Sequence, residues 1–232
     1  MHGDGEPLVW LHGHMGIGSD WKYIFSGPPP GFRLIAPDLR GHGGSPGDEP
    51  VYSFRQAADD IFAILDELHI EGAKLIGLSG GGITALHMAT LQPTRVPSMV
   101  IVSAPAAFPE QARAIQRTFS RAMLGEAELA RMRLRHPRPG QLDTLITQVR
   151  AMPDANDPDF SREQLAAITA RTLIVFGDRD PLYPVSLALD LRQAIARSWL
   201  WVVPNGGHAP VFGPDAPRFA ETALAFLSDS YS

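Results

Sequence analysis

Three side chains in this sequence could together activate a nucleophile: Ser79, Asp180 and His208. A serine hydroxyl is a weak nucleophile until a base removes its proton, and histidine can do so near neutral pH. The histidine in turn needs a carboxylate that fixes its tautomer and stabilises the imidazolium ion. Because the three residues are far apart in the sequence, this chemistry requires a fold that brings them together.

Ser79 lies within Gly77-Leu78-Ser79-Gly80-Gly81, between a short apolar run and a helical pattern. The pattern G-x-S-x-G at a strand-to-helix junction is typical of a nucleophile elbow, a strained turn that exposes the serine oxygen above a sheet. Glycine is expected at 77 and 81 because strand and helix pass close together there. These five residues alone do not distinguish an elbow from an ordinary turn that contains serine.

The elements that would position these residues alternate between strands and helices. Six short apolar runs are predicted as strands: 7–11, 32–36, 73–78, 97–102, 172–176 and 199–203. Helical patterns are predicted at 19–25, after Ser53, and at 82–91, 185–196 and 216–227, with Ser53 as an N-cap followed by Gln56 in a capping box. This alternation predicts βαβ units and a mostly parallel sheet flanked by helices.

The alternation stops between residues 105 and 170. Helices are predicted there at 111–123, 126–135 and 141–152, followed by a looser linker at 153–158 and a short helix from Ser161. We therefore predict an α/β core formed by residues 1–104 and 171–232, with an all-helical cap of residues 105–170 inserted. In a parallel sheet, sites form at the carboxyl ends of the strands. The loops 12–16 and 178–180 should therefore lie near Ser79 and His208.

Composition restricts the classes of function. The chain has 232 residues, 44% hydrophobic and 19% charged, with a net charge of -5, typical of a globular α/β protein. No run of like charge predicts a nucleic-acid or membrane partner. The absence of cysteine excludes disulfides, thiolate metal sites and a cysteine nucleophile. The first residues lack a signal-peptide pattern and no apolar run is long enough to span a membrane, so we expect a cytoplasmic protein.

Five motifs occur in order: His12-Gly13, the segment 38–43 (Asp-Leu-Arg-Gly-His-Gly), the segment 77–81, Gly177-x-x-Asp180 and Gly207-His208. The order Ser, Asp, His along the chain is the order found in α/β-hydrolases. With these motifs the sequence resembles the serine hydrolases of the α/β-hydrolase superfamily that carry a helical cap. Such proteins usually have one or two more strands before the His-Gly loop. The resemblance therefore implies that the N-terminal edge strands of the sheet are shortened or missing.

The same resemblance implies the roles of the residues. Ser79 is the expected nucleophile, His208 the base and Asp180 the acid, while Asp178, the alternative acid, is expected to be a turn residue. The oxyanion hole is expected to use the backbone N–H groups of Gly80 and His14, with Met15 as the alternative to His14. No cofactor is implied. His12 and His14 share one side of an extended segment, but no third ligand is spaced to complete a metal site, so none is predicted.

The implied activity is hydrolysis of a small or medium apolar carboxylic ester through an acyl-enzyme. The partner expected is this small-molecule ester, and the oligomeric state is left open. A serine at the elbow disfavours haloalkane dehalogenases and epoxide hydrolases, which use aspartate. Enol-lactone hydrolase, C–C bond hydrolase, perhydrolase and a ligand-binding protein with little turnover remain alternatives. A dinucleotide-binding fold is disfavoured because the required glycine spacing is absent. Six apolar positions of the cap are expected to form mostly core, with some facing the substrate: Ile115, Phe119, Met123, Leu142, Leu145 and Met152.

Overall fold

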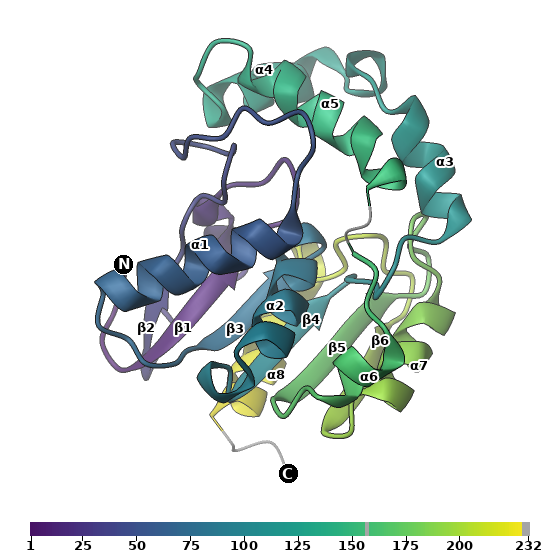
Figure 1. Cartoon of the computed structure of the whole chain (residues 1–232). Coiled ribbons are helices and arrows are strands. Elements are labelled where there is room, and N and C mark those ends of the chain that lie inside the picture. Colours follow the sequence, from purple (N-terminus) through teal and green to yellow (C-terminus); the bar gives the residue numbers. More distant parts are fainter. Residues whose placement is uncertain (156–157, 229–232) are drawn as a thin grey trace.

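The computed structural model describes residues 1–155 and 158–228 of the chain. Residues 156 and 157, within the predicted linker, and residues 229–232, at the end of the predicted core, lie outside this description. Six strands form one sheet (Figure 1): β1 (Glu6–Leu11), β2 (Phe32–Ile35), β3 (Lys74–Leu78), β4 (Ser98–Val102), β5 (Arg171–Gly177) and β6 (Ser198–Val203).

The sheet has the strand order β2-β1-β3-β4-β5-β6, and every neighbouring pair is parallel. The prediction of a mostly parallel sheet is therefore confirmed. The chain runs outward from β1 to β2 and then returns to place β3 on the other side of β1. The strand order thus reverses between β1 and β3, and in open α/β sheets ligands bind beyond the carboxyl ends of the strands at such a reversal.

Alternating residues of the central strands enter two separate cores. Val9 and Leu11 of β1 pack into a core beneath α1 (Phe54–Glu67), α2 (Gly80–Leu91) and α7 (Val185–Ala194). Leu8 and Trp10 face the opposite core, which α8 (Ala216–Leu227) and the 3-10 helix η1 (Gly18–Tyr23) cover. Because both faces are covered, the strands are almost continuously apolar.

At the β2 edge of the sheet, the start of the chain adds a single contact. His2 pairs with Leu34 in an isolated antiparallel bridge, with N···O distances of 2.9 and 2.8 Å. In the described residues, β2 is the last strand on this side of the sheet. After β2 in the chain, helix α1 begins at the predicted N-cap. Ser53 Oγ accepts the Gln56 N–H there at 3.1 Å.

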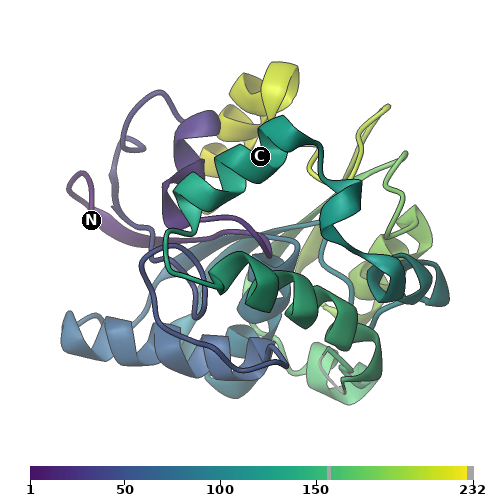
Figure 2. The same cartoon turned by 90° about the horizontal axis from the view of Figure 1, so that it is seen from above.

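Between β4 and β5 lies a helical insertion. In Figures 1 and 2 its residues 110–154 lie above the carboxyl ends of the strands, whereas its residues 162–166 lie lower, beside α7. The insertion contains α3 (Glu110–Thr118), η3 (Arg121–Met123), α4 (Glu126–Arg135), α5 (Gln141–Ala151), η4 (Met152–Asp154) and α6 (Arg162–Ala166). Apart from one isolated bridge between Ala107 and Asp159, its described residues form no strand pairing. None of the helices in the described ranges has the length and apolar character needed to cross a bilayer.

The prediction of one helix over 111–123 was wrong in its C-terminal half. Helix α3 ends at Thr118, and Phe119 leaves it with an extended backbone (ψ 132°). The Thr118 hydroxyl donates to the Ile115 carbonyl at 3.0 Å, a local bond that competes with continuation of the helix. The break places Phe119 against the insertion's own apolar cluster.

Candidate active site

Ser79 lies at a strained turn between β3 and α2. Its backbone angles are φ 51° and ψ -117°, a conformation that residues other than glycine rarely adopt. The turn is tight because its glycines touch backbone: a Cβ on Gly77 would lie 2.5 Å from the Gly81 carbonyl oxygen. A Cβ on Gly81 would lie 2.0 Å from the Leu11 carbonyl oxygen. The sequence interpretation of both glycines is thus confirmed in steric terms.

The fold brings Ser79, His208 and Asp180 into one hydrogen-bonded row. His208 Nε2 lies 2.9 Å from Ser79 Oγ, and His208 Nδ1 lies 2.9 Å from Asp180 Oδ2. Asp180 follows β5, and its other oxygen accepts the N–H groups of Leu182 at 2.8 Å and Tyr183 at 3.2 Å. With Nδ1–H donated to the carboxylate, Nε2 is free to accept the serine proton. This is the arrangement that activates a serine.

The alternative acid, Asp178, does not reach this row. It is exposed to solvent. Its backbone N–H donates to the Val203 carbonyl at 3.2 Å, as expected of a residue in the turn after β5. Of the two carboxylates in this loop, the Asp180 side chain alone is shielded from solvent and in contact with His208.

Two backbone N–H groups border the serine. Gly80 begins α2, so its N–H has no partner within the helix. A Cβ on Gly80 would lie 3.4 Å from the His14 nitrogen, so the two amides are close together. Across residues 1–155 and 158–228, the His14 N–H donates no hydrogen bond. The Met15 N–H is in contrast used, because it donates to His42 Nε2 at 3.1 Å.

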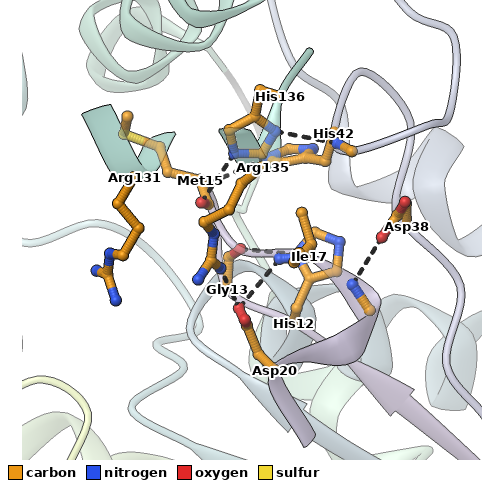
Figure 3. A network of polar contacts seen from close by, with 12 residues as sticks. His12, Gly13, Met15, Ile17, Asp20, Asp38, His42, Arg131, Arg135 and His136 are labelled. Atoms are coloured by element: carbon orange, nitrogen blue, oxygen red, sulfur yellow. Dashed lines mark hydrogen bonds and ion pairs between the residues drawn. The ribbon is translucent and has the colours of Figure 1, made fainter. Parts of the chain in front are cut away.

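Buried histidines support the loop after β1 (Figure 3). Burial lowers the pKa of His12 to about 4 and that of His14 to about 3. Burial also holds the pKa of His42 well below its usual value, with His14 and His12 adding to the effect. Both ring nitrogens of His12 bond to backbone, to Gly13 O at 2.8 Å and to the Leu39 N–H at 2.9 Å, so they are unavailable to a metal.

The contribution of His42 and His136 to this loop was missed at the level of sequence. From the sequence, the segment 38–43 is identified only as a motif, and no role is predicted for His42 or His136. One signal in the sequence could have indicated this contribution. Four histidines lie in the segments 12–14 and 38–43 and in the helical insertion: His12, His14, His42 and His136.

An apolar cavity of about 210 Å³ opens at Ser79. Its walls come from α1 and α2, from the loops after β1, β3, β5 and β6, and from the insertion. They comprise His14, Met15, Phe54, Ser79, Gly80, Ile83, Phe108, Ile115, Gln116, Phe119, Val149, Met152, Leu182, Tyr183 and His208. Gln116 is only 6% exposed, and its Oε1 has no hydrogen-bond partner within the described part of the chain. Its Nε2 meets only the Met152 sulfur, at 3.9 Å.

The six apolar positions of the insertion divide as the sequence analysis expected, with one exception. Ile115, Phe119 and Met152 line the cavity. Leu142 and Leu145 pack instead within the insertion. Met123 was expected to be core or to face substrate, but it is 55% exposed because the chain turns away after α3.

Comparison with known proteins supports the family resemblance that the sequence motifs indicate. A family described as the alpha/beta hydrolase fold matches residues 6–134. The 2-hydroxymuconate semialdehyde hydrolase of Pseudomonas sp. (strain CF600) is 32% identical, over 98% of this chain and 89% of the relative. The pimeloyl-[acyl-carrier protein] methyl ester esterase of Vibrio atlanticus is 27% identical, over 97% of this chain and 96% of the relative.

Among solved structures, a meta-cleavage product hydrolase from Pseudomonas fluorescens superposes with a TM-score of 0.81. It is 24% identical, with 99% of this chain and 93% of that chain covered, and this likeness concerns the fold. The sheet order and the strained serine turn agree with the sequence match: the chain belongs to the α/β-hydrolase fold family, and the two relatives named above are hydrolases.

Proposed function

We propose that this protein is a serine hydrolase that cleaves a small, uncharged carboxylic ester. The observation that carries the proposal is the row Asp180–His208–Ser79, with both hydrogen-bond distances at 2.9 Å, at the wall of an apolar cavity. A buried carboxylate, a partly exposed imidazole and a strained serine are the parts that acyl transfer requires.

The reaction follows from this geometry. Ser79 Oγ attacks the ester carbonyl carbon while His208 Nε2 takes its proton, and Asp180 stabilises the resulting imidazolium. The N–H groups of Gly80 and His14 are the donors for the oxyanion, since Met15 has given its N–H to His42. His208 then protonates the leaving alcohol. Water, deprotonated by His208, attacks the acyl-enzyme, and the acid is released as Ser79 regains its proton.

The cavity limits the substrate. Its volume of about 210 Å³ suits a small ligand, not a long chain. The residues that line it include no lysine or arginine. A charged acyl group would therefore lose its hydration without a compensating cation, so neutral acyl groups of up to medium length are favoured.

Among the residues that the insertion contributes to the cavity wall, Gln116 is the polar one. The Gln116 amide lies among Ile115, Phe119 and Met152 with no strong partner at either end, which costs about 1–3 kcal/mol when the group is buried. We infer that the substrate carries one neutral polar group, such as a hydroxyl or an amide, with which the Gln116 amide pairs when its side chain turns toward the cavity, since Oε1 is closed to solvent in this structure. An otherwise apolar ester with one such group fits the wall better than a plain alkyl ester.

A second candidate is C–C bond hydrolysis on the same row of residues. It is favoured by the 32% identity to a 2-hydroxymuconate semialdehyde hydrolase. That relative's named substrate is a carboxylate, whereas the lining of this cavity offers no cation. We therefore place ester hydrolysis first.

The experiment is a comparison of p-nitrophenyl esters with acyl chains of two to ten carbons, together with lactones and a dienoic 1,5-diketone. Turnover that is highest for short neutral esters and absent in Ser79→Ala supports the proposal, and a fluorophosphonate should label the wild type but not the variant. Turnover of the diketone alone would favour the second candidate. Wild-type turnover in Ser79→Ala would exclude both.

A further inference from the structure

The loop after β1 owes its shape to hydrogen bonds from histidine side chains. Met15 has φ 66°, in the left-handed region that residues other than glycine rarely occupy. Such a conformation persists only where the surroundings fix it. At Met15 both backbone groups are fixed: the N–H donates to His42 Nε2 at 3.1 Å, and the carbonyl accepts from His136 Nε2 at 3.1 Å.

The Gly13–His14 peptide is held in a similar way. The Gly13 carbonyl accepts His12 Nδ1 at 2.8 Å and the Gly16 N–H at 2.8 Å. A peptide is planar, with its C=O and N–H pointing in opposite directions, so fixing the Gly13 carbonyl aims the His14 N–H. That N–H is the one that lies beside Gly80.

His136 differs from the other two rings because it belongs to the helical insertion. It follows α4 as the C-cap residue, and it is 3% exposed. Its Nδ1 accepts the Gly43 N–H at 3.0 Å, so the proton is on Nε2, which donates to Met15. Burial lowers the pKa of His136, in keeping with a neutral ring. Figure 3 shows this ring between the two loops of the core.

Neighbouring contacts dock the insertion on the same loops. Gln141 Nε2 donates to the carbonyls of Gly41 and Gly43, at 2.9 and 3.0 Å. Arg135 pairs with Asp20, whose Oδ2 also accepts the Ile17 N–H at 3.0 Å. The insertion therefore bonds directly to the loops after β1 and β2. On the oxyanion side it makes two such bonds: the Leu145 carbonyl lies 3.3 Å from His14 Nε2, and His136 bonds to the backbone of Met15.

We propose that His136 is a positioning residue that completes the oxyanion hole from the helical insertion. It fixes the Met15–Gly16 peptide, whose Gly16 N–H holds the Gly13 carbonyl and so sets the direction of the His14 N–H. The inference rests on the proposed function. It makes catalysis depend on the docked insertion: without this ring, the strained Met15 loses one of its two anchors. Substrate binding in the apolar cavity does not require His136, which is absent from the cavity wall.

The test compares three variants. His136→Phe keeps an aromatic ring and removes both hydrogen bonds, whereas His136→Gln keeps one donor and one acceptor. Gln148→Leu is the control, because it removes another buried bond from the insertion to the core, Gln148 Nε2 to Glu49 O at 2.8 Å, away from the oxyanion loop. For each variant, kcat and KM are measured with p-nitrophenyl butyrate. The affinity for butylboronic acid is also measured, because its boron adds to the serine oxygen to give a tetrahedral anion.

His136→Phe should lower kcat and boronic acid affinity by about ten- to a hundredfold, part of what a lost oxyanion donor costs, with KM nearly unchanged. His136→Gln should recover most of both losses, and Gln148→Leu should match wild type. A folded His136→Phe with wild-type kcat and affinity would overturn the inference, as would an equal loss in Gln148→Leu. If His136→Phe does not fold, His136→Met takes its place under the same criteria. Failure of the proposed function appears separately, as turnover or boronic acid binding that survives Ser79→Ala.

Discussion

The Gly80 Cα faces the His14 nitrogen so closely that a Cβ on Gly80 would lie 3.4 Å from it, and 2.9 Å from Phe54 Cε1. A Cβ at position 80 would therefore project into the space beside the His14 amide. Any side chain at position 80 competes with the substrate oxygen for it.

Gly80→Ala should consequently lower kcat for short esters by roughly a hundredfold, the range observed when one oxyanion donor is lost. The fold should be retained, because Phe54 can shift its ring. Steady-state kinetics and a thermal melt check the prediction. Gly125→Ala is the control, since a Cβ there meets nothing within 4 Å. Full activity in Gly80→Ala would show that the added Cβ does not compete with the substrate oxygen.

Asp180→Asn should lower kcat on the order of ten-thousand-fold, because the amide cannot hold the His208 tautomer or stabilise the imidazolium. Asp178→Asn, two residues away and exposed, should behave as wild type. The pair is measured with one ester at saturating concentration. A large loss in Asp178→Asn together with an active Asp180→Asn would reverse the assignment of the acid.

Stability should fall when the pH drops below 6.5. His12, for example, has a pKa of about 4 in the folded chain, against 6.5 as its ordinary value. Between these values the unfolded chain binds a proton that the folded chain excludes, so the free energy of unfolding decreases as the pH falls. His12 alone accounts for on the order of 3 kcal/mol by pH 4, and His14, His42 and His136 shift in the same direction.

Urea denaturation at pH 7.5, 6.0 and 5.0 measures this loss. The exposed His69 provides the control, since His69→Asn should leave the pH dependence unchanged. Stability that is constant or rises from pH 7.5 to 5.0 would contradict buried, neutral histidines around the β1 loop.

Gln116→Leu should have opposite effects on stability and specificity. Removing a buried amide without a strong partner should raise the free energy of unfolding by about 1 kcal/mol. It should also reduce kcat/KM for an ω-hydroxyalkanoyl ester relative to the alkanoyl ester of equal length. Ile115→Val, an apolar change in the same wall, is the control for packing. An unchanged ratio of the two kcat/KM values in Gln116→Leu would exclude recognition by Gln116.

Much of the architecture was predictable because strands, turns and glycines have local causes. The parallel sheet followed from the alternation of apolar runs with helical patterns. The common location of Ser79, Asp180 and His208 followed from the strands that precede them, since each residue comes just after the carboxyl end of a parallel strand. The end of α3 was not predictable, because it depends on a Thr118 hydroxyl bond and on the cavity that Phe119 faces. His136 was invisible for a related reason: its partners Met15 and Gly43 are 121 and 93 residues away.

The ring of His136 between two core loops also limits how the parts of this protein can be exchanged. Cap insertions are attractive units for recombination, because they border the substrate cavity while the core carries the nucleophile. Here a transplanted insertion would need a donor for the Met15 carbonyl and an acceptor for the Gly43 N–H at the end of its own α4. A chimera that lacks them would inherit the new pocket on a slower enzyme.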